Sequence, residues 1–140
     1  MPTLQTMAEI EKFVVIGSNS FSGACFSDYV LRNNPSAEVL GISRSPEYNN
    51  CFLPYKQSGE DRFAFYQLDL NQDLVKMVEV IREFRPEYIV NFSAQGMVAQ
   101  SWGQPGQWFQ TNCLGIMDLV HELKEDNYLK RYVQISSPEV

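Results

Sequence analysis

The chain has 140 residues, a formal net charge of −6 and an apolar share of 44%. This length suits one domain with a sizeable core. No apolar run reaches the roughly 20 residues of a membrane-spanning helix, so we expect no membrane partner. A negative surface repels the phosphate backbone of nucleic acid, which we exclude as a partner. We therefore expect a soluble cytoplasmic protein.

The cysteines are three in number and far apart: Cys25, Cys51 and Cys113. They form no CxxC pair, and His121 is the only imidazole in the chain, so we expect neither a metal site nor a disulfide framework. Residues 1–12 lack the basic and apolar regions of a signal peptide. We expect them to be a flexible lead-in.

The first elements form a strand, a helix and a second strand. Apolar, β-branched runs at residues 12–17 and 37–43 predict the two strands. Between them, Phe21, Cys25 and Tyr29 recur at helical spacing. The pattern indicates one βαβ unit, in which a helix connects two parallel strands.

The alternation of strand and helix continues along the chain. We expect strands at residues 62–70, 87–94 and 130–136, and helices at residues 73–84 and 105–123. Five such strands imply an α/β fold, a doubly wound parallel sheet with helices on both faces. Right-handed crossovers favour the order 3-2-1-4-5, with ligands at the switch point between the first and fourth strands. The polar stretch 45–61 predicts a loop.

A glycine-rich turn, Gly17-Ser-Asn-Ser20-Phe21-Ser-Gly23, follows the first strand and opens the first helix. In this context it predicts a dinucleotide pyrophosphate site and a Rossmann-like NAD(P)-binding domain over residues 1–140. Gly17 allows the tight turn and Gly23 allows close helix packing. Ser20 replaces the usual middle glycine, so its hydroxyl can bind phosphate although its Cβ obstructs close approach. We include Phe21 in the site. Alternatively, the turn serves backbone geometry alone.

The end of the second strand favours NADP over NAD. Binders of NAD usually carry an acid here, whereas this chain has Ser43-Arg44-Ser45. The Arg44 guanidinium suits a 2′-phosphate, with the Ser43 or Ser45 hydroxyl donating to it. Alternatively, Arg44 is a solvated side chain at a strand end.

Four further motifs follow the glycine turn in order: LDL at 68–70, NFSAQGMVAQSW at 91–102, TNCLG at 111–115 and ISSPEV at 135–140. Together they resemble the extended short-chain dehydrogenase/reductases, within them the nucleotide-sugar epimerase/dehydratase group. Within that group, the motifs look most like those of GDP-mannose 4,6-dehydratase-like proteins. The resemblance runs from about Lys12 to the last residue and implies a nucleotide-sugar substrate.

The resemblance also assigns residues to the adenine. Asp69 would accept a hydrogen bond from the adenine amino group, and Leu70 would lie beside the ring. Taken on its own, Asp69 favours the interpretation of a cap for a helix that begins near Asn71.

On the nicotinamide side, the resemblance makes Asn91 to Ala94 the wall beside the ribose, including Phe92 and Ser93. It makes Asn112 a residue that orients the active-site water or backbone. The stretch Met97 to Trp102 would border the sugar-nucleotide pocket. Phe92 and Ala94 could instead be plain core, and Asn112 an ordinary early helix residue.

The C-terminal motif matches the family's catalytic positions. Ser137 matches a hydroxyl residue that hydrogen-bonds the sugar hydroxyl being oxidised. Glu139 matches a glutamate that removes the proton next to the new ketone. Pro138 departs from the acid that protonates the leaving hydroxyl in glucose-type dehydratases. Alternatively, Glu139 is a surface carboxylate.

The family's Tyr-x-x-x-Lys pair is absent from these 140 residues. We therefore expect the cofactor-binding half of a 4,6-dehydratase, cut after the fifth strand and inactive alone. The parent reaction would be oxidation at C4, loss of water, and re-reduction at C6. Alternatives are a 4-epimerase or reductase of the family, or a non-catalytic dinucleotide-binding protein. The resemblance implies a homodimer or higher homo-oligomer.

Overall fold

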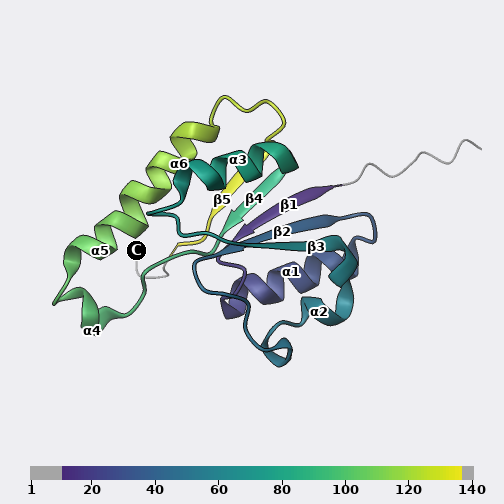
Figure 1. Ribbon diagram of the computed structural model, residues 1–140, viewed down its shortest axis with the longest axis horizontal. Coiled ribbons are helices and arrows are strands. Elements are labelled where there is room, and N and C mark those ends of the chain that lie inside the picture. The colour runs from purple at the N-terminus through teal and green to yellow at the C-terminus, as the bar shows by residue number, and fades with distance from the viewer. Residues whose placement is uncertain (1–10, 137–140) are drawn as a thin grey trace, which may run out of the picture.

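The computed structural model describes residues 11–136, which contain a five-stranded parallel sheet. Its strand order, β3-β2-β1-β4-β5, confirms the predicted doubly wound topology (Figure 1). The strands are β1 Lys12–Ile16, β2 Glu38–Ser43, β3 Phe63–Gln67, β4 Tyr88–Asn91 and β5 Arg131–Gln134. The third and fourth strands end three residues earlier than expected, and β1 begins inside the expected lead-in.

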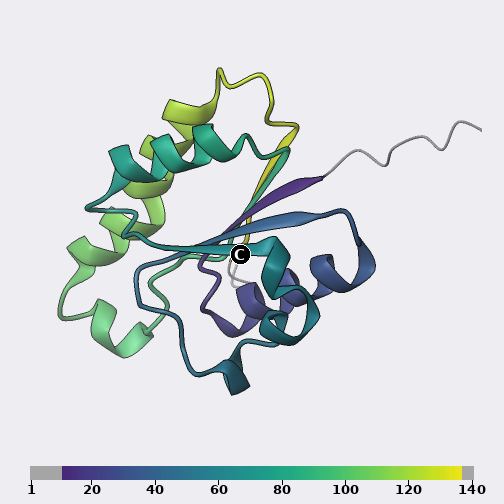
Figure 2. The same ribbon diagram turned by 45° about the vertical axis from the view of Figure 1, so that its right-hand side comes forward.

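Helices cover both faces of the sheet, as Figures 1 and 2 show. On one face lie α1 (Phe21–Asn33) and α2 (Tyr55–Ser58), and on the other lie α3 (Leu74–Phe84) and α6 (Ile116–Leu123). A short α4 (Val98–Ser101) precedes α5 (Pro105–Phe109), which continues through the π-helical η3 (Gln110–Gly115) into α6. No helix within residues 11–136 has both the length and the apolar character needed to span a membrane.

Each face of the sheet has its own apolar core. Side chains alternate across a strand, so the central strand β1 contributes Val14 and Ile16 to one core and Val15 to the other. The first core includes Met77 of α3 and Leu119 of α6. All five side chains are buried. The two cores fix β1 and therefore the turn that follows it.

Helix α1 confirms the predicted element, but its buried face differs from the stripe that predicted it. Phe21 and Tyr29 are 85% and 64% exposed, and Cys25 is also exposed. The buried face instead includes Ala24 and Leu31, which pack on the sheet. The helical spacing was informative even though it marked the outer face.

Residues 45–61 are more ordered than the predicted loop. They contain η1 (Asn50–Phe52), α2 and the start of η2 (Glu60–Arg62). The Arg62 guanidinium donates hydrogen bonds to four backbone carbonyls, those of Leu31, Asn34, Ala37 and Ser58, at 2.8–3.3 Å. A cation beside the last carbonyls of α1 complements the helix dipole, so Arg62 joins this segment to the end of α1.

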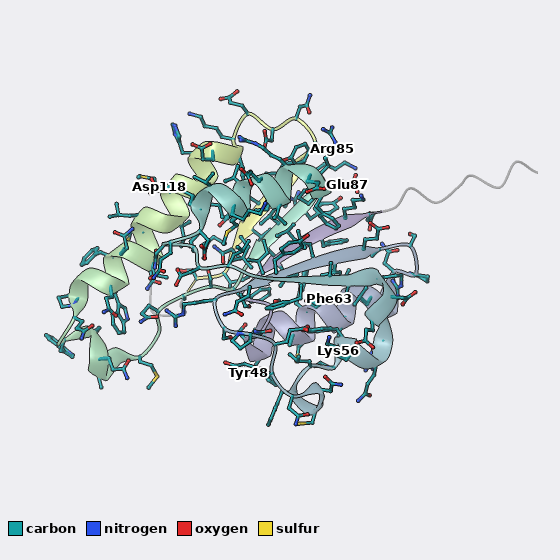
Figure 3. All side chains as sticks on the ribbon, viewed as in Figure 1. Tyr48, Lys56, Phe63, Arg85, Glu87 and Asp118 are labelled. Atoms are coloured by element: carbon teal, nitrogen blue, oxygen red, sulfur yellow. The ribbon has the colours of Figure 1, made fainter. Side chains whose placement is uncertain are left out.

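A glycine in β2 admits an aromatic ring from β3. A Cβ on Gly41 would lie 2.4 Å from Cζ of Phe63. The Phe63 ring stacks on Tyr55 of α2, with ring centroids 3.9 Å apart. Figure 3 shows Phe63 and Lys56 on the face of the sheet that α1 and α2 cover. The absent side chain at Gly41 therefore allows β2, β3 and α2 to pack together.

Candidate functional site

The glycine turn has the local geometry predicted from the sequence. Gly17 has φ +80°, and a Cβ there would lie 2.9 Å from the backbone nitrogen of Ser93. A Cβ on Gly23 would lie 2.3 Å from the carbonyl oxygen of Gly17. Real side chains do not tolerate such approaches, so Gly17 makes the turn and Gly23 lets α1 pack on it.

Ser20 caps the N-terminus of α1. Its backbone is extended, with φ −69° and ψ 156°, and therefore needs no glycine. Its Oγ accepts a hydrogen bond from the Gly23 amide at 3.0 Å. A serine at this position satisfies one free helix amide, and its hydroxyl proton remains able to donate to a ligand.

Serine hydroxyls connect the glycine turn to the end of β2. The Ser43 Oγ accepts from the Asn19 backbone amide at 3.0 Å and lies 3.3 Å from the Ser18 Oγ. Ser43 is buried, whereas the next residue, Arg44, is exposed. Within residues 11–136, no carboxylate forms an ion pair with the Arg44 guanidinium.

The turn that follows Arg44 is held from two sides. Asn19 Nδ2 donates to the Ser45 and Pro46 carbonyls at 2.9 and 2.8 Å, and to the Ser45 Oγ at 3.2 Å. On the opposite side, the Glu47 carboxylate accepts from the Tyr55 hydroxyl at 2.8 Å and from Lys56 at 3.0 Å.

The groups that hold Glu47 have shifted pKa values. Burial, reinforced by the Glu47 carboxylate, raises the pKa of Tyr55 far above its ordinary value. The hydroxyl therefore stays protonated, and able to donate, at neutral pH. Burial lowers the pKa of Lys56, but the Glu47 and Glu60 carboxylates outweigh this effect and raise it overall. Glu47 thus remains fully engaged with α2.

Asp69 stabilises a local turn at the end of the third strand. Its Oδ1 accepts from the Asn71 amide at 2.8 Å, and its own amide donates to the Asp73 carboxylate at 2.8 Å. The N-cap of α3 is Asp73, so the helix begins later than the predicted cap at Asp69 implied. Leu70 beside it is buried.

At the end of β4, a buried asparagine orders the chain. Asn91 is fully buried, and its Oδ1 accepts from the Ser93 amide at 2.8 Å and the Ser93 hydroxyl at 2.6 Å. Its Nδ2 donates to Tyr132 and Gln134 of β5 at 2.9 and 3.0 Å. Burial raises the pKa of Tyr132, partly opposed by this hydrogen bond.

Asn112 holds the chain after β4 from the other side. From the π-helical η3, its Oδ1 accepts from the Gln95 amide at 2.8 Å, and its Nδ2 donates to the Gln95 carbonyl at 3.0 Å. π-Helical turns often occur at functional sites. Asn112 thus holds the Gln95 backbone, while its part in orienting an active-site water or backbone stays a prediction.

These elements surround a cleft of about 310 Å³. It lies at the carboxyl ends of β1, β2 and β4, where the topology predicts a ligand site. Most predicted cofactor-binding residues line it, namely Gly17, Ser20, Ser43, Arg44, Asp69, Leu70, Phe92, Ser93 and Ala94. Phe21, Gly23 and Asn112 do not line it.

The cleft also has lining residues that the sequence reasoning missed. They include Asn19, Tyr48, Asn71, Gln95 and Thr111. Ser45, proposed as an alternative donor beside Arg44, also lines the cleft. Tyr48 is 53% exposed and lies on the α1–α2 side of the sheet (Figure 3). An aromatic residue four positions after Arg44 was a detectable signal, but the stretch that holds it read as an unstructured loop.

Some predicted positions fall outside the described residues, and others are not among those that line this cleft. Ser137 and Glu139 fall outside the described residues. Trp102 is 86% exposed, and a second cavity of about 370 Å³ lies between α4 and α5 beside Trp108. Among residues 11–136, no three metal-ligating side chains gather into a site.

A family model described as GDP-mannose 4,6 dehydratase matches residues 14–140. Two curated relatives are a dTDP-glucose 4,6-dehydratase of Neisseria meningitidis, 25% identical over 94% of this chain, and a UDP-glucose 4-epimerase of Mycoplasma pneumoniae, 27% identical over 81%. The chain spans 39% and 32% of their respective lengths.

Solved structures show the same fold. A UDP-glucose 4-epimerase of Bifidobacterium longum, in complex with NAD+ and UDP, superimposes with a TM-score of 0.77 at 19% identity. A dTDP-glucose 4,6-dehydratase of Bacillus anthracis, in complex with NAD, gives 0.71 at 21% identity. Each comparison covers 91% of this chain and 37% of the other. The match over residues 14–140 shows that the chain belongs to the GDP-mannose 4,6 dehydratase family, within the extended short-chain dehydrogenase/reductases.

Proposed function

We propose that this chain is the cofactor-binding part of an NADP-dependent nucleotide-sugar 4,6-dehydratase. The single observation that carries the cofactor assignment is an arginine, Arg44, that lines a cleft built around a glycine turn and has no ion-pair partner within residues 11–136. The family match and the N. meningitidis dehydratase support the reaction class.

The cleft suits a dinucleotide. Gly17 leaves backbone at the cleft where a Cβ would clash, and the first amides of α1 provide donors for a pyrophosphate. Asn19 is 7% exposed, and its Oδ1 has no hydrogen-bond partner in the described chain. A buried acceptor without a partner is costly, so it favours a ligand that donates a hydrogen bond.

The choice of NADP depends on the residues around Arg44. The nearest following acid, Glu47, accepts hydrogen bonds from Tyr55 and Lys56 and is not among the residues that line the cleft. Arg44 offers a planar set of donors that matches a phosphate. The B. longum and B. anthracis structures are complexes with NAD+ and NAD respectively, and NAD is the alternative cofactor for this chain.

Bound NADP would supply hydride acceptance and return, and the residues of this chain would hold the reacting groups in place. Ser43 and Arg44 would hold the 2′-phosphate end, and Asp69 and Leu70 the adenine. Ser137 would orient the sugar hydroxyl through a hydrogen bond, and Glu139 would take the proton beside the ketone. Without a Tyr-x-x-x-Lys pair, residues 1–140 alone would bind cofactor without turnover.

Cofactor preference is tested by calorimetric titration of the chain with NADP and NAD. We expect NADP to bind more tightly than NAD. Arg44→Ala should weaken NADP binding by roughly 10- to 100-fold, the range expected for charge-assisted hydrogen bonds, and should leave NAD binding almost unchanged. Arg131→Ala, on the far edge strand, is the matched control. Equal or tighter binding of NAD by the unmodified chain would refute the assignment.

The reaction class is tested on the full-length protein with a panel of nucleoside-diphosphate hexoses in D2O. A dehydratase should release a 4-keto-6-deoxy sugar with deuterium at C5, and Glu139→Gln should lose most of that activity. A 4-epimerase, the alternative favoured by the M. pneumoniae relative, would return a C4 epimer without label at C5. That outcome would replace the dehydratase assignment.

The proposal includes self-association of the parent enzyme. Phe109 of α5 and Met117 and Val120 of α6 are exposed. An apolar stripe of this kind on a helical segment favours a second copy as partner. Sedimentation of the full-length protein should show a dimer or larger assembly, and a monomer at micromolar concentration would contradict this expectation. A cytoplasmic location stays a prediction.

A further inference from the structure

Asn19 connects the glycine turn, which would receive the pyrophosphate of a dinucleotide, with the turn after Arg44, which would receive its 2′-phosphate. Its backbone belongs to the glycine turn, and its amide donates to the Ser43 Oγ. Its side chain reaches across to Ser45 and Pro46, in the turn after Arg44. The side chain is almost fully buried and its donor group serves three acceptors at 2.8–3.2 Å.

These contacts leave the side chains of Arg44 and Tyr48 available to a ligand. Ser45 and Pro46 are held by Asn19, and Glu47 is held by Tyr55 and Lys56. The residues on either side of this held segment, Arg44 and Tyr48, are both exposed and both line the cleft. The backbone between them is therefore fixed while their side chains remain free to meet a ligand.

We propose that Asn19 is a positioning residue for cofactor selectivity. By fixing the turn after Arg44, it sets where the guanidinium lies relative to the glycine turn, and so favours a dinucleotide with a 2′-phosphate. The inference rests on the proposed pairing of Arg44 with that phosphate.

The physical basis is preorganisation. A long arginine side chain already loses rotamer entropy when it binds, and an unanchored backbone would add the cost of ordering the turn. Because Asn19 belongs to the glycine turn, the structure that receives the pyrophosphate also holds the turn that would receive the 2′-phosphate. NAD lacks the 2′-phosphate and should be insensitive to that second connection.

The test uses ADP-ribose and 2′-phospho-ADP-ribose as probes, titrated into the unmodified chain, Asn19→Ala, Arg44→Ala and the double variant. We expect Asn19→Ala to lower the preference for the phosphorylated probe about five- to tenfold, as the loss of one or two hydrogen bonds implies. In the Arg44→Ala background, Asn19→Ala should cause no further loss of preference. Ser20→Ala, which removes the α1 cap in the same turn, should weaken the binding of both probes equally.

An equal loss of both probes in Asn19→Ala would show that Asn19 only supports the glycine turn, and would overturn the inference. So would a loss of preference that persists in the double variant. If Arg44→Ala itself leaves the preference unchanged, the proposed NADP assignment fails first and the inference fails with it. Urea unfolding of each apo variant checks folding, and Asn19→Ser, too short to reach the three acceptors, replaces Asn19→Ala if that variant does not fold.

Discussion

The Asn112 side-chain amide pairs with both backbone polar groups of Gln95, 17 residues earlier in the chain. The pair forms two hydrogen bonds of 2.8 and 3.0 Å between the π-helical η3 and the segment that follows β4. Gln95 lies beyond the end of β4 at Asn91, so its backbone is outside the hydrogen bonds of the sheet. The Asn112 side chain supplies the partners that a neighbouring strand would otherwise provide.

We expect Asn112→Ala to lower the free energy of unfolding by about 2 kcal/mol, since two partly buried backbone groups lose their partners. The substitution should also weaken the binding of NADP, because Gln95 lines the cleft. Asn112→Asp keeps the acceptor and should lose less stability. Urea unfolding measures both variants, and an Asn112→Ala protein as stable as the parent would contradict the argument.

Gly17→Ala should be strongly destabilising. The φ of +80° and the 2.9 Å approach to the Ser93 nitrogen together impose roughly 2–4 kcal/mol of strain. Gly106→Ala is the matched control, because Gly106 lies in α5 and the new Cβ would meet none of the described residues within 4 Å apart from the local helix backbone. That change should be neutral or stabilising by up to about 1 kcal/mol. Chemical denaturation of the two variants distinguishes strain at the turn from a general effect of added methyl groups.

Arg62→Met should cost about 2–4 kcal/mol in unfolding free energy, since four backbone carbonyls, those at the ends of α1 and α2 and that of Ala37, lose a charged donor. Arg62→Lys should recover only part of this loss, because one ammonium cannot reproduce the planar fork. Thermal unfolding with Arg131→Met as control provides the comparison. Full recovery by lysine would show that charge alone matters here.

Alkaline pH should expose the contribution of Tyr55. Its pKa is raised in the folded protein, so the associated stability is complete below the unfolded pKa of about 10 and is lost as the pH rises through the folded value. Above pH 10 the parent should lose about 1.4 kcal/mol more per pH unit than Tyr55→Phe. The two stability curves should therefore converge. Parallel curves between pH 9 and 12 would disprove the coupling.

The sequence predicted the order of the sheet because β-branched runs such as Lys12–Ile16 and the crossover rule act locally and generally. It also predicted the geometry of Gly17 and Gly23, since a strand, a turn and a helix at that spacing allow few alternatives. Most predicted cofactor residues lie around one cleft for the same reason: they follow strands that end at one edge.

The contacts that hold residues 45–62 could not be read in advance. Arg62 reaches Leu31 across 31 positions, and Asn19 reaches Ser45 across 26. Proline and glycine at Pro54 and Gly59 indicated a loop, because turn residues report local conformation and not the long-range hydrogen bonds that order a segment. The reversed face of α1 has a similar origin: spacing alone does not say which side of a helix meets the sheet.

The missing side chain at Gly41 has an implication for engineering this protein. Phe63 fills the space beside it, Phe63 stacks on Tyr55, and Tyr55 binds Glu47 in the turn after Arg44. A side chain at position 41 would displace the Phe63 ring and, through it, the contacts of Tyr55 and Glu47. A laboratory selection for altered cofactor use should therefore recover substitutions at buried positions such as Gly41 as well as at the arginine itself.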